Sequence, residues 1–134
     1  MNIDEIASYA VELKTRRGFN CAQAVLLALK DETGLSQDEL VKIGAGFCAG
    51  MGTMEATCGA LIGANIALGL KSNNNGTLRY SRMLVEEFKN ASHALTCKDL
   101  KARGNDGRPI CPCEDCVRNA VLSYFKVSEP FQAQ

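Results

Sequence analysis

The stretch Gly44–Leu70, GAGFCAGMGTMEATCGALIGANIALGL, is the part of the sequence that decides the fold. Its second half consists almost entirely of Ala, Leu and Ile, which predicts a helix that is buried on most of its surface. Gly59 and Gly63 stand four residues apart within that helix. Because a glycine inside a helix costs about 1 kcal/mol relative to alanine, two of them indicate that another backbone packs closely there. The first half is too rich in glycine for a stable helix and predicts a loop that leads to Cys58.

The remaining sequence predicts helices that pack around this central one. Apolar residues recur at helical spacing, and Asn20 and Ser36 each begin a capping box. No segment alternates apolar and polar residues with a period of two, so we expect no strands. The prediction is an all-α, single-domain bundle of about five to six helices around a Gly/Ala-rich central helix, with residues 127–134 as a frayed tail. The predicted helices cover residues 2–16, 21–33 and 37–43, the second half of the central stretch, and a long segment from Leu78 to Leu95. A short helix that contains Cys97 is capped by Thr96, and Pro112 takes the first position of the last helix.

Composition argues against several kinds of partner. The chain has 134 residues and a formal net charge of zero, with charges of both signs interspersed. Nucleic-acid binding needs a clustered basic face, so we expect no nucleic acid as a partner. The central helix is short, rich in glycine and interrupted by Asn65, so we expect no membrane span. The N-terminus has the features of neither a signal peptide nor a transit peptide, and the expected location is the cytoplasm.

Seven cysteines are the outstanding feature of the composition. In a cytoplasmic chain we expect them to be metal ligands or redox thiols rather than a disulfide framework. The alternative is that cysteines serve as small buried hydrophobes, and for Cys48 alone that is the expected role. The one histidine, His93, has no evident orienting partner, so we do not expect a cysteine–histidine hydrolase.

Four of the cysteines fall at or near predicted helix starts. A helix N-terminus stabilises an anion through its free backbone N–H groups, and it therefore suits a thiolate. If the four converge, they form an all-thiolate site that serves zinc or an iron–sulfur cluster equally well. Gly59 and Gly63 would then provide close packing at that site. The four candidate ligands are Cys21, Cys58, Cys97 and Cys113.

A second pattern is CPCEDC, residues 111–116, in which Cys113 and Cys116 form a CxxC pair at a helix start. This spacing gives a reactive dithiol in thioredoxin-like proteins, although the βαβ context of that fold is missing. With Cys111 the segment becomes a dense thiol cluster suited to metal capture or thiol–disulfide exchange. The alternative is that one or two of these three cysteines are exposed extras.

Together these features resemble the family of redox-active proteins that is named after its C…GCAxxG…C…C pattern. The segment NCAQAVLLAL, with Cys21, resembles the first cysteine segment of the family. TCGALIGA, with Cys58, resembles the central motif, here in the order Cys-Gly-Ala. Cys97 resembles the third cysteine and Cys113 the fourth. The cysteines beyond these four are Cys48, Cys111 and Cys116.

The resemblance implies a small helical protein of anaerobic bacteria or archaea with a redox role. A similar domain occurs beside haem-binding segments in split-Soret-type cytochromes, where the cysteines are associated with an iron–sulfur centre. The resemblance therefore favours iron–sulfur over zinc. The chain contains no CxxCH, so it attaches no c-type haem itself.

Three expectations of function follow. The first is a redox or electron-transfer protein in which the four candidate ligands hold an iron–sulfur cluster and an unidentified partner protein exchanges the electrons. The second is an oxidoreductase acting on thiols and disulfides through Cys113 and Cys116, with Cys111 or Cys97 resolving. The third is a structural zinc protein or interaction module. In addition, the glycine side of the central helix could form a homodimer seam if nothing covers it within the monomer.

Overall fold

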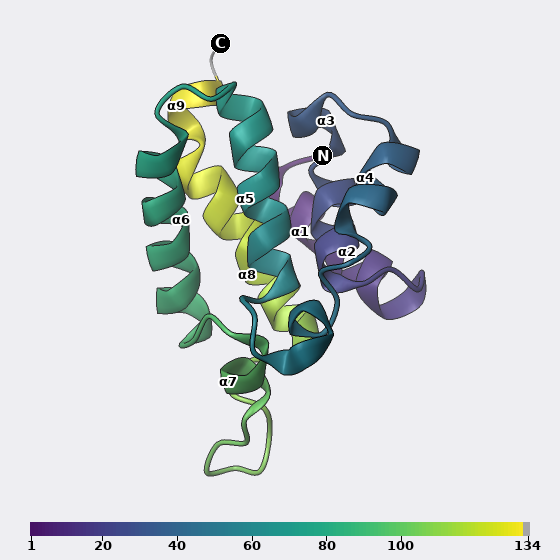
Figure 1. The fold of residues 1–134 in the computed structure, drawn as a ribbon, viewed down its shortest axis with the longest axis vertical. Helices are drawn as coiled ribbons and strands as arrows, with labels where there is room; N and C mark the ends of the chain where they lie inside the picture. The colour runs from purple at the N-terminus through teal and green to yellow at the C-terminus, as the bar shows by residue number, and fades with distance from the viewer. Residues whose placement is uncertain (133–134) are drawn as a thin grey trace.

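The computed structural model describes residues 1–132, and within this range every regular element is helical (Figure 1). The β-type pairings in the same range are two isolated bridges, Thr57–Thr96 and Arg103–Pro109. Six of the helices have eight or more residues: α1, α2, α4, α5, α6 and α8. The prediction of an all-α single domain is confirmed. The elements are α1 (Ile3–Arg16), α2 (Cys21–Ala28), α3 (Lys30–Thr33), α4 (Gln37–Gly44), the distorted helical turn η1 (Gly50–Met54), α5 (Gly59–Ser72), α6 (Thr77–Ser92), α7 (Cys97–Lys101), α8 (Cys113–Val127) and α9 (Glu129–Gln132).

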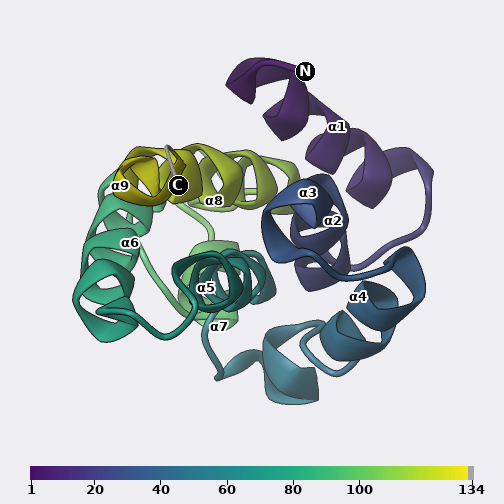
Figure 2. The same cartoon turned by 90° about the horizontal axis from the view of Figure 1, so that it is seen from above.

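Helix α5 is the centre of the bundle. Seen from above in Figure 2, it lies among the other long helices, and it contacts α2, α3, α6 and α8. Ala60, Ala64 and Ala67 of this helix are fully buried, and small side chains of this kind let its neighbours approach closely. The prediction of a central helix rich in glycine and alanine is confirmed.

The two glycines of α5 lie where α2 and the preceding loop press against it. A Cβ atom at Gly63 would stand 2.9 Å from the carbonyl oxygen of Ala22, and one at Gly59 would stand 2.5 Å from that of Phe47. Both distances are too short for a real side chain, so glycine is required at each position. This side of α5 is therefore covered within the chain, so the condition for the homodimer seam expected there is not met.

The predicted capping boxes at Asn20 and Ser36 are both present. Asn20 accepts a hydrogen bond of 2.8 Å from the amide of Gln23, and its own side-chain amide donates to the carbonyl oxygen of Gly44 at 3.2 Å. The same cap therefore starts α2 and ties it to the end of α4. The helix predicted over 21–33 is divided at Leu29, where φ and ψ of −93° and 17° interrupt the α-helical geometry.

The C-terminal segment is ordered helix as far as Gln132. Helix α8 continues to Val127, and α9 places Phe131 in the core with 7% of its surface exposed. The Phe131 ring packs edge-on against Tyr80, with 4.8 Å between the ring centroids. The expected frayed tail is therefore wrong for residues 127–132, because an aromatic ring is anchored there. Residues 133 and 134 lie outside the described part of the chain.

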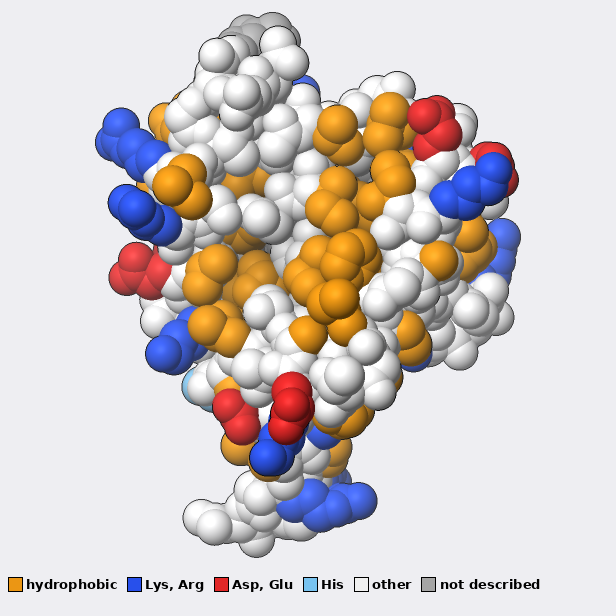
Figure 3. All heavy atoms as spheres, in the orientation of Figure 1, with side chains coloured by type: hydrophobic (Ala, Val, Ile, Leu, Met, Phe, Trp, Pro, Cys, Tyr) orange, Lys and Arg blue, Asp and Glu red, His pale blue; other side chains and the backbone are white. Residues whose placement is uncertain are grey.

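The outer side of α5 is only partly covered. Figure 3 shows apolar side chains gathered in the middle of the face along which α5 runs in Figure 1. Ile62, Ile66 and Leu70 follow one another at intervals of four residues, and Leu70 is 39% exposed. A groove of about 520 Å³ beside them is lined in part by Met51 and Val85. None of the helices in residues 1–132 combines the length and apolar character that a bilayer span requires.

Candidate cysteine centre

Six of the seven cysteines gather where α5 and α8 begin, close to α7, at the lower end of the bundle in Figure 1. They come from four segments that are far apart in the sequence, which together form the cysteine centre. Helix α2 contributes Cys21, the N-cap of α5 contributes Cys58, α7 contributes Cys97, and the start of α8 contributes Cys111, Cys113 and Cys116.

Main-chain hydrogen bonds hold these segments together. The amide of Cys58 donates to the carbonyl oxygen of Leu95 at 2.8 Å, which ties the start of α5 to the segment before α7. The amide of Cys111 donates to the carbonyl oxygen of Leu100 at 3.0 Å, which ties the segment before α8 to α7 itself. The backbone therefore brings distant cysteines together without help from their side chains.

The first contact within the centre joins Cys113 to Cys21. A hydrogen bond from the Cys21 thiol lowers the pKa of Cys113 to about 5 against the effect of burial, and the positive charge of Lys101 contributes to the same shift. The same hydrogen bond, together with burial, raises the pKa of Cys21. Cys113, at the first position of α8, is therefore the thiol of this pair that loses its proton more readily.

The second contact places Cys116 between Cys111 and Cys58. The sulfur of Cys116 lies 3.0 Å from that of Cys111, and its thiol also hydrogen-bonds the Cys58 sulfur. This bond from Cys116 lowers the pKa of Cys58 to about 7, although burial opposes the shift. The amides of Ala60 and Leu61 face the Cys58 sulfur from the first turn of α5 and lower its pKa further, without closing a full cap hydrogen bond.

These three cysteines are among the most buried residues of the chain. Cys116, Cys111 and Cys58 are 0%, 3% and 5% exposed, and Cys113 is half-buried. The alternative that one or two cysteines of CPCEDC are exposed extras is therefore wrong. Cys116 lies on the buried face of α8, and its sulfur is 3.0 Å from that of Cys111.

Cys97 lies at the outer edge of the centre, against the turn η1. Its sulfur is 3.6 Å from the Sδ atom of Met54. Ala49, Met51 and Met54 have φ values of 52°, 57° and 65°, a left-handed conformation that costs energy in residues other than glycine. A Cβ atom at Gly50 would lie 3.0 Å from the Cβ atom of Cys97, so this strained turn is fitted closely to the cysteine.

Cys48 is exposed, and the expectation that it is a buried hydrophobe is wrong. It lies in the loop before η1, where the chain enters the left-handed conformation at Ala49 and leaves the core. Its charge still raises the pKa of Cys97, although burial is the largest cause of that shift. Cys48 therefore lies near the centre but takes no part in its two contacts.

Lys101 is a member of the centre that the sequence did not indicate. Its ammonium donates to the carbonyl oxygen of Cys111 at 3.2 Å and also hydrogen-bonds the Cys113 sulfur. Burial lowers the pKa of Lys101, but the charges of Cys116 and Cys113 outweigh burial and the net shift is upward. Lys101 follows Cys97 by four residues on α7, but it is ten or more residues from the cysteines of CPCEDC, so no sequence motif connects it to Cys111 and Cys113.

The centre has sulfur donors for a metal, but they touch one another instead of surrounding an open position. In residues 1–132, no three His, Cys, Asp or Glu side chains are already arranged as ligands of one metal ion. Of the four candidate ligands, Cys21 contacts Cys113, while Cys58 contacts Cys116. Cys97 is close enough for the charges of Cys58 and Cys113 to affect its pKa.

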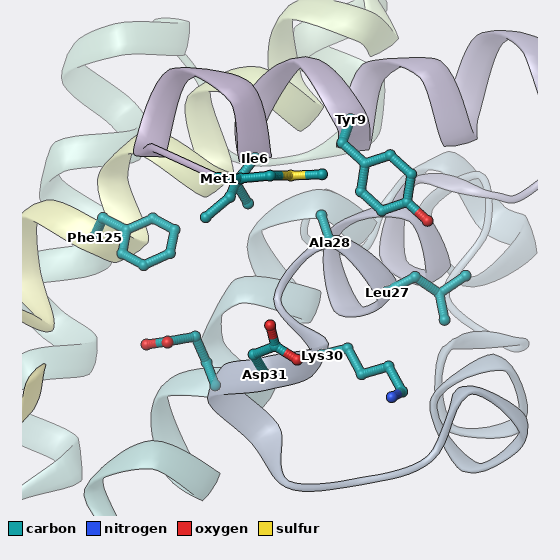
Figure 4. Close-up of a pocket in the computed structure, with 9 residues that line it drawn as sticks. Met1, Ile6, Tyr9, Leu27, Ala28, Lys30, Asp31 and Phe125 are labelled. Atoms are coloured by element: carbon teal, nitrogen blue, oxygen red, sulfur yellow. The ribbon is translucent and has the colours of Figure 1, made fainter.

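A separate pocket of about 300 Å³ lies away from the cysteines. Figure 4 shows its wall, in which Met1, Tyr9 and Phe125 face residues of α2 and α3. Figure 1 places this region beside α3 and the N-terminus, at the end of the bundle opposite α7. No cysteine lines it, so it is not part of the site described above.

The chain is an all-helical domain in which thiols cluster near a lysine ammonium group. These features place it in the class of cysteine-rich helical proteins. Residues 19–125 match the family described as "Putative redox-active protein (C_GCAxxG_C_C)", and this range includes all seven cysteines. The chain belongs to this family, and the resemblance seen in the sequence is confirmed. Neither a curated protein nor a solved structure matches the chain.

Proposed function

We propose that the cysteine centre carries electrons and that Cys21, Cys58, Cys97 and Cys113 hold an iron–sulfur cluster there. The single observation behind this proposal is that six thiols from four segments converge at one end of the bundle. A partner protein, not yet identified, would exchange electrons at the same end of the bundle.

The chemistry of the donors fits such a group. Thiolates are the usual ligands of iron–sulfur clusters, and Cys113 and Cys58 already have lowered pKa values. Zinc also binds thiolates, but it has no redox chemistry and would not explain a redox-active family. One-electron transfer is the chemistry that an iron–sulfur cluster supplies when it is bound.

The residues around the donors have complementary roles. The first turn of α5 faces Cys58 and favours its deprotonated form, while Cys21 and Lys101 do the same for Cys113. The core around Cys58 limits access of water. Cys21 and Cys113 already lie beside each other, and they would hold the group together with Cys58 and Cys97.

Replacing each ligand in turn tests this proposal. After anaerobic purification, Cys21→Ser, Cys58→Ser, Cys97→Ser and Cys113→Ser should each lose iron and acid-labile sulfide. Cys48→Ser is the matched control, because this cysteine is exposed and takes no part in the contacts. Far-UV circular dichroism would identify any variant that has lost its fold. An unchanged visible spectrum in all four folded variants would contradict cluster binding.

A second candidate function is thiol–disulfide exchange, and the 3.0 Å between the sulfurs of Cys111 and Cys116 favours it. This is a different pair from the Cys113–Cys116 dithiol that the CxxC spacing suggested. In such an exchange the two thiols would pass two electrons and two protons to an external disulfide such as glutathione disulfide. One sulfur–sulfur bond would form in the protein and two molecules of glutathione would be released.

The two possible pairs can be told apart by mass spectrometry. After oxidation with glutathione disulfide, the metal-free protein should contain a Cys111–Cys116 disulfide. Cys113→Ser should still form it, whereas Cys111→Ser should not. A disulfide that joins Cys113 to Cys116 instead would contradict the pairing proposed from the structure.

A further inference from the structure

Lys101 places a positive charge inside the cysteine centre. It is the last residue of α7 and is half-buried. Its Nζ atom donates to the carbonyl oxygen of Cys111 at 3.2 Å, two residues before Cys113. This contact joins α7 to the segment before α8 and holds the ammonium group close to the thiols of that segment.

The charge of Lys101 acts on most of the centre. No carboxylate in residues 1–132 forms an ion pair with Lys101, so its charge is directed at sulfur. The second cation close to the thiols is Lys14, which affects Cys21 and Cys113. The cysteines whose thiolate forms Lys101 favours are Cys58, Cys97, Cys111 and Cys113.

We propose that Lys101 is a positioning residue that raises the reduction potential of the cysteine centre. Reduction of a cluster by one electron adds one negative charge, and reduction of a disulfide by two electrons yields two thiolates, each of which can then take up a proton. In either case a cation fixed nearby stabilises the reduced form more than the oxidised form. The inference rests on the proposed redox function but holds for either carrier.

The test is a redox titration of the purified protein and of variants that differ in charge at one position. Lys101→Gln removes the charge but keeps a side-chain donor for the Cys111 carbonyl, and Lys101→Arg keeps the charge. Lys98→Gln is the matched control, because Lys98 is exposed on the same helix and is equally cationic. We expect the midpoint potential to fall in Lys101→Gln and to stay near the wild-type value in the other two variants.

The outcomes separate this role from the proposed function. A reversible couple whose potential is the same in wild type and Lys101→Gln, with equal iron or disulfide content, would overturn the role of Lys101 alone. A wild-type protein without any reversible couple would contradict the proposed function and this role with it. Thermal melts of each variant identify a purely structural effect, because a structural contact would change the melting temperature without moving the potential.

A second measurement detects the charge of Lys101 and does not need a redox titration. Iodoacetate is an anion and iodoacetamide is neutral, and both alkylate a thiolate by displacing iodide. The ratio of their rates therefore reports the local electrostatic potential at the thiol. We expect this ratio at Cys113 to fall severalfold in Lys101→Gln and to remain unchanged in Lys98→Gln. An equal ratio in the two variants would show that the ammonium does not act on the thiols.

Discussion

At the scale of single residues, the cysteine centre consists of proton donors and proton acceptors of one chemical type. The pKa values of Cys21 and Cys116 are raised, mainly because each is hydrogen-bonded to another sulfur and in addition because burial disfavours the thiolate. Cys113 lies against the Cys21 thiol, while Cys111 and Cys58 lie against the single S–H of Cys116, and the pKa values of all three are lowered. Identical side chains therefore have different reactivities because of their positions, and individual cysteines can be tested separately.

The pKa of Cys113 gives the first prediction. In the reduced, metal-free protein its alkylation by iodoacetamide should be fast at neutral pH and should slow only as the pH falls through about 5. Cys21→Ala removes the hydrogen bond that lowers this pKa, and it should move the midpoint of the pH–rate profile upward by about one pH unit or more. The control is Cys111→Ala, which alters the other contact group. An unchanged midpoint in Cys21→Ala would show that this bond does not set the pKa.

At the scale of helices, the packing of the bundle depends on the close approach of α2 to α5. Gly63→Ala would push a Cβ atom to 2.9 Å from the Ala22 carbonyl oxygen, and we expect it to reduce the free energy of unfolding by about 1–3 kcal/mol. Gly69→Ala is the matched control on the same helix, because the nearest atom to its Cβ would be 3.9 Å away. That change should stabilise the protein by about 0.5–1 kcal/mol. Urea denaturation measures both, and a stable Gly63→Ala protein would contradict the tight crossing.

Helix α9 gives a second prediction at this scale. Phe131 is buried against Tyr80, so Phe131→Ala should reduce the free energy of unfolding by about 3 kcal/mol. Glu129→Ala, on the exposed side of the same short helix, should change it by less than about 0.5 kcal/mol. If urea denaturation finds the two variants equally stable, the C-terminal helix does not pack as described.

The elements also show what the sequence could predict and what it could not. The caps at Asn20 and Ser36 and the glycine crossing of α5 were predictable, because each depends on residues within one turn or one face of a helix. The burial of Phe131 was not predictable, because a single aromatic residue that follows a short break in the helix produces no periodic pattern. The exposure of Cys48 depends on the left-handed conformation of the loop around it, and the sequence of that loop does not predict this conformation.

For the whole molecule, the convergence of cysteines was predictable in outline but its pairings were not. Helix starts identified Cys21, Cys58 and Cys113 as thiols in similar environments. The approach of Cys116 to Cys111 and Cys58 depends on how α8 is rotated and on main-chain bonds to α7. The position of Lys101 depends on the same contacts. Such features arise only once the helices have assembled.

The core and the cysteine centre are sufficiently separate for a further prediction. Leu68 and Val121 are fully buried and lie two or more turns beyond the starts of α5 and α8, where the cysteines gather. Because packed apolar side chains form this core, removal of metal by a chelator should leave the far-UV circular dichroism almost unchanged. Unfolding by the chelator would indicate a structural metal instead, with zinc as the first candidate.

The most direct measurement is the amount of iron, zinc and acid-labile sulfide per chain after anaerobic purification, with a visible spectrum before and after reduction. The account predicts iron and sulfide together, with a broad absorption that bleaches on reduction. Zinc without iron would contradict an electron-carrying cluster, and no metal at all would leave the Cys111–Cys116 pair as the redox group.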